Sequence, residues 1–139
     1  MRVGKESGIA DYAYRKAVAI NGQHRTALHL AVRKGVRIAT GSDIYTSTGG
    51  LAGWGLNGHE VGHLVEAGMT PLRAIEAGTA NGPLTLGPQA PKSGQLKVGY
   101  DADVLVLAEN PLDRIGVLAE PEKIRKVWKS GELAKNLPI

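Results

Sequence analysis

The chain has 139 residues, with 17 Lys and Arg against 13 Asp and Glu, and 42% of its residues are hydrophobic. This length allows at most one ordinary domain, and an aromatic content of only 4% leaves the core to aliphatic side chains. The absence of Cys excludes disulfide scaffolds, Cys-ligated zinc and thiol nucleophiles, so any metal must be bound by His, Asp or Glu.

Charge and hydropathy narrow the range of partners. The net charge of +4 is spread evenly along the chain, which argues against nucleic acid as a partner. No apolar run is long enough for a membrane span, and the N-terminus has no apolar signal region. We therefore expect a cytoplasmic protein without a nucleic-acid or membrane partner.

The first part of the chain alternates helical spacing with one strand-like run. Apolar residues at helical spacing predict two helices over 12–34, separated at Asn21-Gly22 and ended by Gly35. The β-branched run 36–40 predicts a buried strand that opens into a polar loop over 41–58. Further helices are predicted over 59–67, ended by Gly68, and over 72–77, where Thr70 is the N-cap, with a short helical turn over 81–86.

The pattern changes after Gly87-Pro88. Strands are predicted over 95–98, 103–107 and 124–129, with a short helix near 112–118 and a hairpin turn at Ser130-Gly131 leading into 132–135. Asp101 and Asp103 are expected to be solvated at the entrance of the middle strand. The fold class is therefore α/β, with a parallel α/β segment over 1–87 and a β-rich segment over 88–139.

One local motif suggests zinc. Residues 59–63 read His59-Glu60-Val61-Gly62-His63, an H-E-x-x-H pattern that places two imidazoles on one helix face with Glu60 as general base. A third ligand is missing, because no His follows His63 and Glu66 lies two turns from His59, about 10 Å away. Glu76 would require the next helix to fold back. The alternative interpretation is a surface helix with two exposed His.

A second candidate is the acid after the predicted strand 36–40. In α/β barrels catalytic groups project from the C-terminal ends of strands, and Asp43 follows such an end. A carboxylate there can bind a metal and accept a proton from metal-bound water, although an Asp after a strand can also cap a turn.

Other side chains have weaker signals. Trp54 and His59 are candidates to line a substrate loop, although Trp54 can equally anchor the loop to the core. His24 and His29 are five apart on a predicted helix and face different directions, so we expect surface or packing roles for them.

Four separated motifs extend the argument over most of the chain: AxxKGVRIATGSD over 31–43, EVGHLVEAGMTPLRAIEAGTAN over 60–81, GQLKVGYDADVLVLAENPLD over 94–113 and IRKVWKSG over 124–131. Their order and spacing resemble the C-terminal part of the amidohydrolase superfamily, with the closest resemblance to the imidazolonepropionase and prolidase-like branch of metal-dependent hydrolases.

The resemblance implies the C-terminal portion of a (β/α)8 metal-dependent hydrolase barrel, followed by strands of a small β-sandwich. Asp43 would lie at the end of the eighth strand as metal ligand and general base, and the cofactor would be a divalent metal, with zinc expected first. The family's His-x-His, its bridging carboxylated Lys or Glu and its two later His have no counterpart here. Since a barrel needs about 250 residues, we expect this segment alone to be inactive.

These observations predict part of an amidohydrolase that cleaves C–N bonds of a small-molecule substrate with a metal-activated water. A zinc metallopeptidase using His59, Glu60 and His63 is the alternative, and a non-catalytic association module is the third hypothesis. Because an incomplete barrel leaves open sheet edges, we expect a homo-oligomer or association with the missing N-terminal part.

Overall fold

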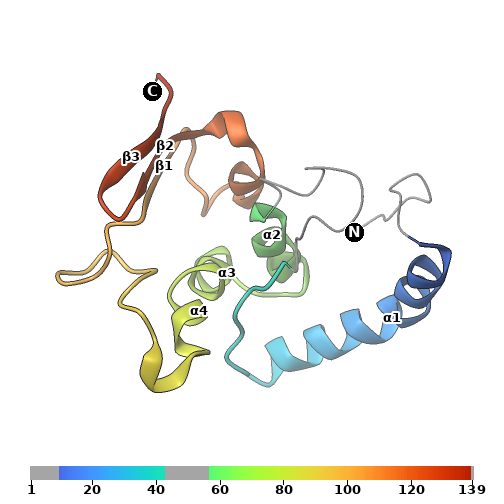
Figure 1. Ribbon diagram of the computed structural model, residues 1–139. Coiled ribbons are helices and arrows are strands. Elements are labelled where there is room, and N and C mark those ends of the chain that lie inside the picture. Colours follow the sequence, from blue (N-terminus) through green and yellow to red (C-terminus); the bar gives the residue numbers. More distant parts are fainter. Residues whose placement is uncertain (1–9, 43–56, 139) are drawn as a thin grey trace.

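The computed structural model describes residues 10–42 and 57–138, which form a helical part and a three-stranded sheet (Figure 1). Asp43 and Trp54 lie outside the described residues. The elements in chain order are α1 (Asp11–Arg33), α2 (Gly58–Glu66), α3 (Pro71–Gly78), α4 (Asn81–Leu84), the 3₁₀ helix η2 (Gly87–Gln89), β1 (Val104–Leu107), the 3₁₀ helices η3 (Ile115–Ala119) and η4 (Pro121–Lys123), β2 (Ile124–Lys129) and β3 (Glu132–Asn136).

Helix α1 is one continuous helix of 23 residues, so the predicted break at Asn21-Gly22 is wrong. A helix tolerates an internal Gly at a cost of about 1 kcal/mol, which its neighbours offset. The helix projects away from the other helices in Figure 1, and none of its residues is buried by the described part of the chain. No helix in the described ranges combines the length and apolar character that a membrane span requires.

The end of α1 follows the local sequence closely. Gly35 has a φ of +68°, and its N–H donates to the Val32 carbonyl at 3.0 Å. The Val36 N–H donates to the Ala31 carbonyl, also at 3.0 Å, which completes a Schellman motif. The predicted C-cap at Gly35 is therefore confirmed, because only a residue without a Cβ adopts this conformation at no steric cost.

Helices α2 and α3 form the main core. Val61 and Leu64 of α2 pack against Ala74 and Ala77 of α3, and both alanines are fully buried. The predicted N-cap of α3 is confirmed, because the Thr70 hydroxyl accepts a hydrogen bond from the Arg73 N–H at 3.3 Å. The partly buried residues around this core come from both parts of the chain: Leu28, Ile38, Val65, Met69, Ile75, Ile115 and Leu118.

The sheet is antiparallel with strand order β1-β2-β3. Trp128 of β2 lies between Val104 of β1 and Leu133 of β3. The hairpin turn is Ser130-Gly131, with φ values of +50° and +84° that match the right-handed twist of the strands. The prediction of strand 124–129 and of the hairpin turn is confirmed. Asp103 is not merely solvated, because its carboxylate accepts hydrogen bonds from the Ser130 N–H at 2.8 Å and from Lys129.

Two predicted strands are absent from the described residues. Residues 36–40 are extended but have no strand beside them within the described ranges, and residues 95–98 form an irregular segment that ends in a turn. A strand exists only with a neighbour to complete its hydrogen-bond ladder. The predicted parallel sheet is therefore not formed within 10–42 and 57–138, where the observed sheet is antiparallel, and the β-sandwich stays a prediction.

The helical and sheet parts meet at η3, which packs against α2.

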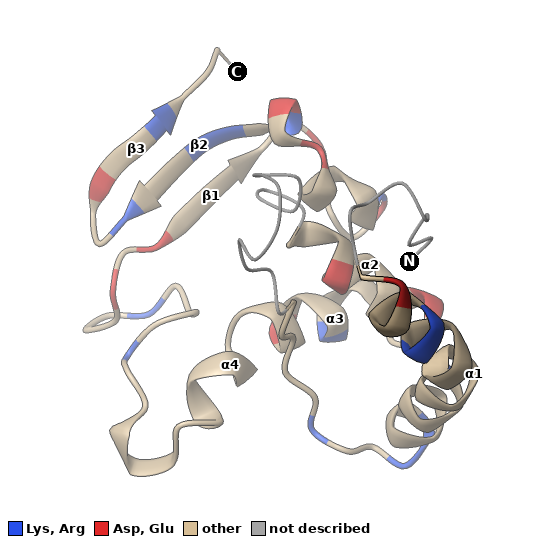
Figure 2. Ribbon diagram, turned by 45° about the vertical axis from the view of Figure 1, so that its right-hand side comes forward, with Lys and Arg blue, Asp and Glu red and all other residues tan. Residues whose placement is uncertain are grey.

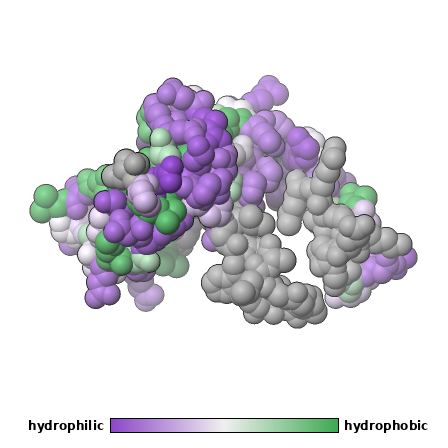
Figure 3. All heavy atoms as spheres, turned by 90° about the horizontal axis from the view of Figure 1, so that it is seen from above, coloured by the Kyte–Doolittle hydropathy of each residue, from purple (hydrophilic) through white to green (hydrophobic). Residues whose placement is uncertain are grey.

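An ion-pair cluster closes the loop between β1 and β2: Arg114 pairs with Glu109 and Glu120, and Lys123 pairs with Glu109 at 2.7 Å. Figure 2 shows both signs of charge on η4 and β3. Figure 3 shows apolar patches on the surface. Leu96 and Val98 are 84% and 100% exposed.

Candidate functional site

The structure describes the backbone that leads toward Asp43 as far as Ser42. The segment 36–40 runs beside α3 and α4 and is held by two hydrogen bonds. The Thr40 N–H donates to the Ala77 carbonyl at 3.0 Å, and the Asn81 side-chain amide donates to the Ile38 carbonyl at 2.9 Å. Asp43 therefore stays a predicted site residue, and the part of the site that the structure describes is the backbone support before it.

The H-E-x-x-H residues lie on α2, as predicted. His59 is exposed, whereas Glu60 and His63 are half-buried. The His63 Nδ1 faces the Glu66 carboxylate at 3.4 Å, one turn along the same helix. In the part of the chain that the structure describes, no group of three or more His, Cys, Asp or Glu is arranged to hold a metal. The two imidazoles of α2 thus have no third ligand among the described residues.

A groove of about 230 Å³ lies between α1 and α2, and its lining includes His24 and His29, for which surface or packing roles were expected. His29 forms a hydrogen bond through Nδ1 with the Ala67 carbonyl at 3.0 Å, at the C-terminal end of α2. This contact joins residues 38 positions apart and agrees with a packing role for His29. The groove is lined by Asn21, His24, Arg25, Leu28, His29, Glu60, His63, Glu66 and Ala67.

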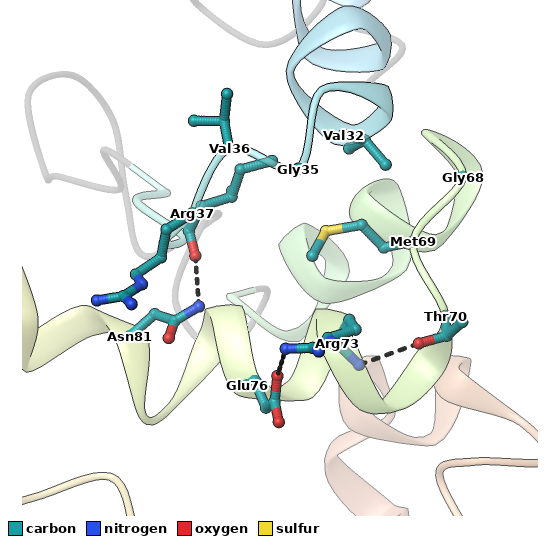
Figure 4. Close-up of a pocket in the computed structure, with 11 residues that line it drawn as sticks. Val32, Gly35, Val36, Arg37, Gly68, Met69, Thr70, Arg73, Glu76 and Asn81 are labelled. Carbon is teal, nitrogen blue, oxygen red and sulfur yellow. Dashed lines mark hydrogen bonds and ion pairs between the residues drawn. The ribbon is translucent and has the colours of Figure 1, made fainter.

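A larger cavity of about 520 Å³ opens between the end of α1, residues 36–38 and α3 (Figure 4). Its wall is apolar at Val32, Val36 and Met69. Arg73 pairs with Glu76 at 3.0 Å along the edge of α3, so these charges neutralise each other. Figure 4 shows Asn81 reaching from α4 to the extended segment, a contact that the sequence does not predict because its partner lies 43 positions away.

The strongest electrostatic perturbations lie in the sheet part of the molecule, at the loop between β1 and β2 and at the hairpin between β2 and β3. Hydrogen bonds from Arg114 and Lys123 lower the pKa of Glu109 to about 2. The Arg114 guanidinium also lowers the pKa of Glu120, and hydrogen bonds from the Ser130 N–H and Lys129 lower that of Asp103. Each carboxylate is paired with a cation, Glu109 and Glu120 in one cluster and Asp103 in a separate pair, so these shifts describe structural ion pairs in which all three groups stay ionised at neutral pH.

Comparison with known proteins shows which family the chain belongs to. Residues 2–134 match the Amidohydrolase family, and the chain belongs to this family. It lies in the prolidase-like branch of the superfamily, as its relatives indicate.

Among sequence relatives, the chain is 46% identical over 129 residues to ochratoxinase from Aspergillus niger, covering 92% of this chain and 25% of that protein. The chain thus spans about a quarter of the length of the curated relatives it matches.

Solved structures of related proteins also match nearly the whole of this chain and less than a third of their own length. The crystal structure of A. niger ochratoxinase matches with a TM-score of 0.74 and 45% identity, covering 96% of this chain and 29% of that chain. A prolidase complexed with N-methylphosphonate-L-proline matches with a TM-score of 0.79 and 27% identity over 96% of this chain and 31% of its own. A Xaa-Pro dipeptidase with methionine bound in its active site matches with a TM-score of 0.75 and 28% identity, covering 95% of this chain and 30% of that chain.

Proposed function

We propose that this chain is part of an amidohydrolase that cleaves C–N amide bonds of small molecules with a metal-activated water, and that Asp43 is its general base and a metal ligand. The observation that carries the proposal is the 46% identity to ochratoxinase over 92% of the chain, within a family match over 2–134. A divalent metal, with zinc expected first, would polarise the attacking water. The described residues do not complete a ligand set for it, so no ligand beyond Asp43 is assigned.

The role of Asp43 follows from the chemistry of amide hydrolysis. Water is a weak nucleophile at neutral pH, and a carboxylate within hydrogen-bond reach accepts its proton as the bond to the amide carbon forms. The described structure supports this role indirectly: the backbone before Asp43 is fixed at Ile38 and Thr40, and a general base must be held in place.

The relatives suggest a substrate class. One is named an ochratoxinase, one a prolidase solved with a phosphonate analogue of a proline compound, and one a Xaa-Pro dipeptidase. We therefore propose dipeptide-like amides as substrates, and Xaa-Pro dipeptides and ochratoxin form the first panel to assay.

We also propose that the chain works in association, either with a second copy or with further amidohydrolase barrel elements. Large apolar residues such as Val36 and Leu30 are more than half exposed. Exposed apolar side chains of this kind are typical of a surface that is covered by a partner.

The test is substitution in the active hydrolase that contains this chain. Asp43→Asn keeps the shape of the side chain but removes the base, so kcat should fall by about 10²-fold or more while the fold persists. His59→Ala and His63→Ala should have much smaller effects. The reverse pattern, with activity lost in the two His variants and kept in Asp43→Asn, would favour the zinc metallopeptidase that uses His59, Glu60 and His63.

A further inference from the structure

The segment 36–42 poses a physical question, because it has the β-branched sequence of a strand but no strand beside it in the described residues. An extended backbone without a ladder needs other partners for its polar groups. Two hydrogen bonds satisfy such groups here, and their partners lie in α3 and at the start of α4. The Thr40 N–H donates to the Ala77 carbonyl at 3.0 Å, and Asn81 Nδ2 donates to the Ile38 carbonyl at 2.9 Å.

The first contact depends on small residues in α3. The last carbonyls of a helix have no intrahelical partner, so the Ala77 carbonyl is free to accept from Thr40. Ala77 is fully buried, and a Cβ added at Gly78 would lie 3.9 Å from the Thr40 hydroxyl and 3.0 Å from Val61. Larger side chains at these positions would push the extended segment away from α3.

The second contact depends on the side chain of Asn81. This residue opens α4, and its half-buried side chain crosses to a carbonyl 43 positions earlier in the sequence. A side-chain amide is a donor that a carboxylate or an aliphatic side chain cannot replace. Because the Ile38 carbonyl lies partly buried at this contact, losing the donor removes the partner that the described residues give this acceptor.

We propose that Asn81 is a positioning residue for amide hydrolysis, which holds the Ile38 carbonyl and thereby sets the path of the backbone toward Asp43. The inference rests on the proposed function. Asp43 follows Ile38 by five residues, a reach of at most about 18 Å even for a fully extended chain. An anchor so near constrains where the carboxylate is placed, and a misplacement of about 1 Å can cost about 10²-fold in rate.

The local arm of the test measures hydrogen exchange in the isolated chain. Asn81→Leu removes the donor without changing the net charge, and Asn136→Leu is the matched control because Asn136 is exposed on β3. We expect exchange of the Thr40 amide, which pairs with the Ala77 carbonyl, to rise about 10-fold or more in Asn81→Leu and to stay unchanged in the control. Asn81→Ala is the second variant, for the case that Leu does not fit. Unchanged exchange in both Asn81 variants overturns the inference.

The catalytic arm uses the active hydrolase that contains this chain, with rates expressed per mole of folded enzyme. We expect Asn81→Leu to lower kcat by about 10-fold to 10²-fold and to leave KM within about threefold, because the base is displaced while substrate contacts remain. A residue that only supports the fold would lower the folded fraction instead and leave kcat per folded enzyme unchanged.

The outcomes separate the two proposals. If the wild-type enzyme hydrolyses amides and Asp43→Asn abolishes this activity, but Asn81→Leu keeps the wild-type kcat, only the positioning role of Asn81 is refuted. If the wild-type enzyme hydrolyses no amide, the proposed function is refuted and the positioning role with it.

Discussion

The contact between α2 and η3 joins the helical part to the sheet part, and a single glycine makes it possible. Gly58 opens α2, and a Cβ added there would lie 1.9 Å from the Leu118 carbonyl oxygen, 2.4 Å from the Leu118 carbonyl carbon and 2.9 Å from the Ala119 nitrogen. All three are backbone atoms, which cannot move aside as the end of a flexible side chain can. Gly58→Ala therefore forces α2 and η3 apart.

The expected cost follows from two opposing terms. Overpacking costs about 1 to 3 kcal/mol, and a distance of 1.9 Å calls for the upper end of this range. Replacing Gly by Ala in a helix stabilises the helix by up to about 1 kcal/mol. We expect Gly58→Ala to lower the free energy of unfolding by about 2 kcal/mol and the Tm by roughly 8 °C.

Gly62→Ala is the matched control, because it makes the same substitution in the same helix where a new Cβ meets no atom within 4 Å. This variant should raise the free energy of unfolding by about 0.5 to 1 kcal/mol. Urea unfolding followed by circular dichroism measures both variants under identical conditions. Equal shifts in the two variants, or a gain in Gly58→Ala, would refute the close contact of α2 with η3.

Three further outcomes are expected. The pKa of Glu109 is about 2 in the folded chain, against an ordinary value of 4.5, so its pairing with Arg114 and Lys123 stabilises the fold above pH 4.5 and is lost as the pH falls toward 2. Acid unfolding of Glu109→Gln should accordingly be less pH-dependent over this window than that of the wild type; identical profiles would contradict the pairing. Calorimetric titration of the isolated chain should find no tight one-to-one zinc complex, since His59 and His63 lack a third ligand among the described residues; a tight complex that disappears in His63→Ala would overturn this expectation. Sedimentation of the isolated chain should show self-association, and a compact, cooperatively melting monomer at low concentration would contradict the proposed association.

The sequence predicted much of the candidate site only through its resemblance to a known family. The order of motifs predicted the amidohydrolase family, which the match over residues 2–134 confirms. The role of Asp43 stays a prediction, because that residue lies outside the described residues. Asn81 was part of the same motifs, but nothing in its spacing indicated that its side chain reaches the Ile38 carbonyl.

The sequence by itself determined the features that depend on neighbours a few positions apart. The end of α1 at Gly35, the start of α3 at Thr70 and the hairpin at Ser130-Gly131 all follow from one residue's backbone freedom or one short side-chain hydrogen bond. Such signals act within a single turn, so the rest of the chain hardly alters them.

Only the tertiary structure decided the features that need a distant partner. The β-branched run 36–40 is extended without becoming a strand, because a ladder requires a neighbour and the described residues supply Ala77 and Asn81 instead. The continuity of α1 through Gly22 and the contact of Gly58 with Leu118 likewise exceed what local propensity indicates. Propensities differ by about 1 kcal/mol or less per residue, whereas packing contacts and buried hydrogen bonds contribute as much or more, so the long-range contacts prevail.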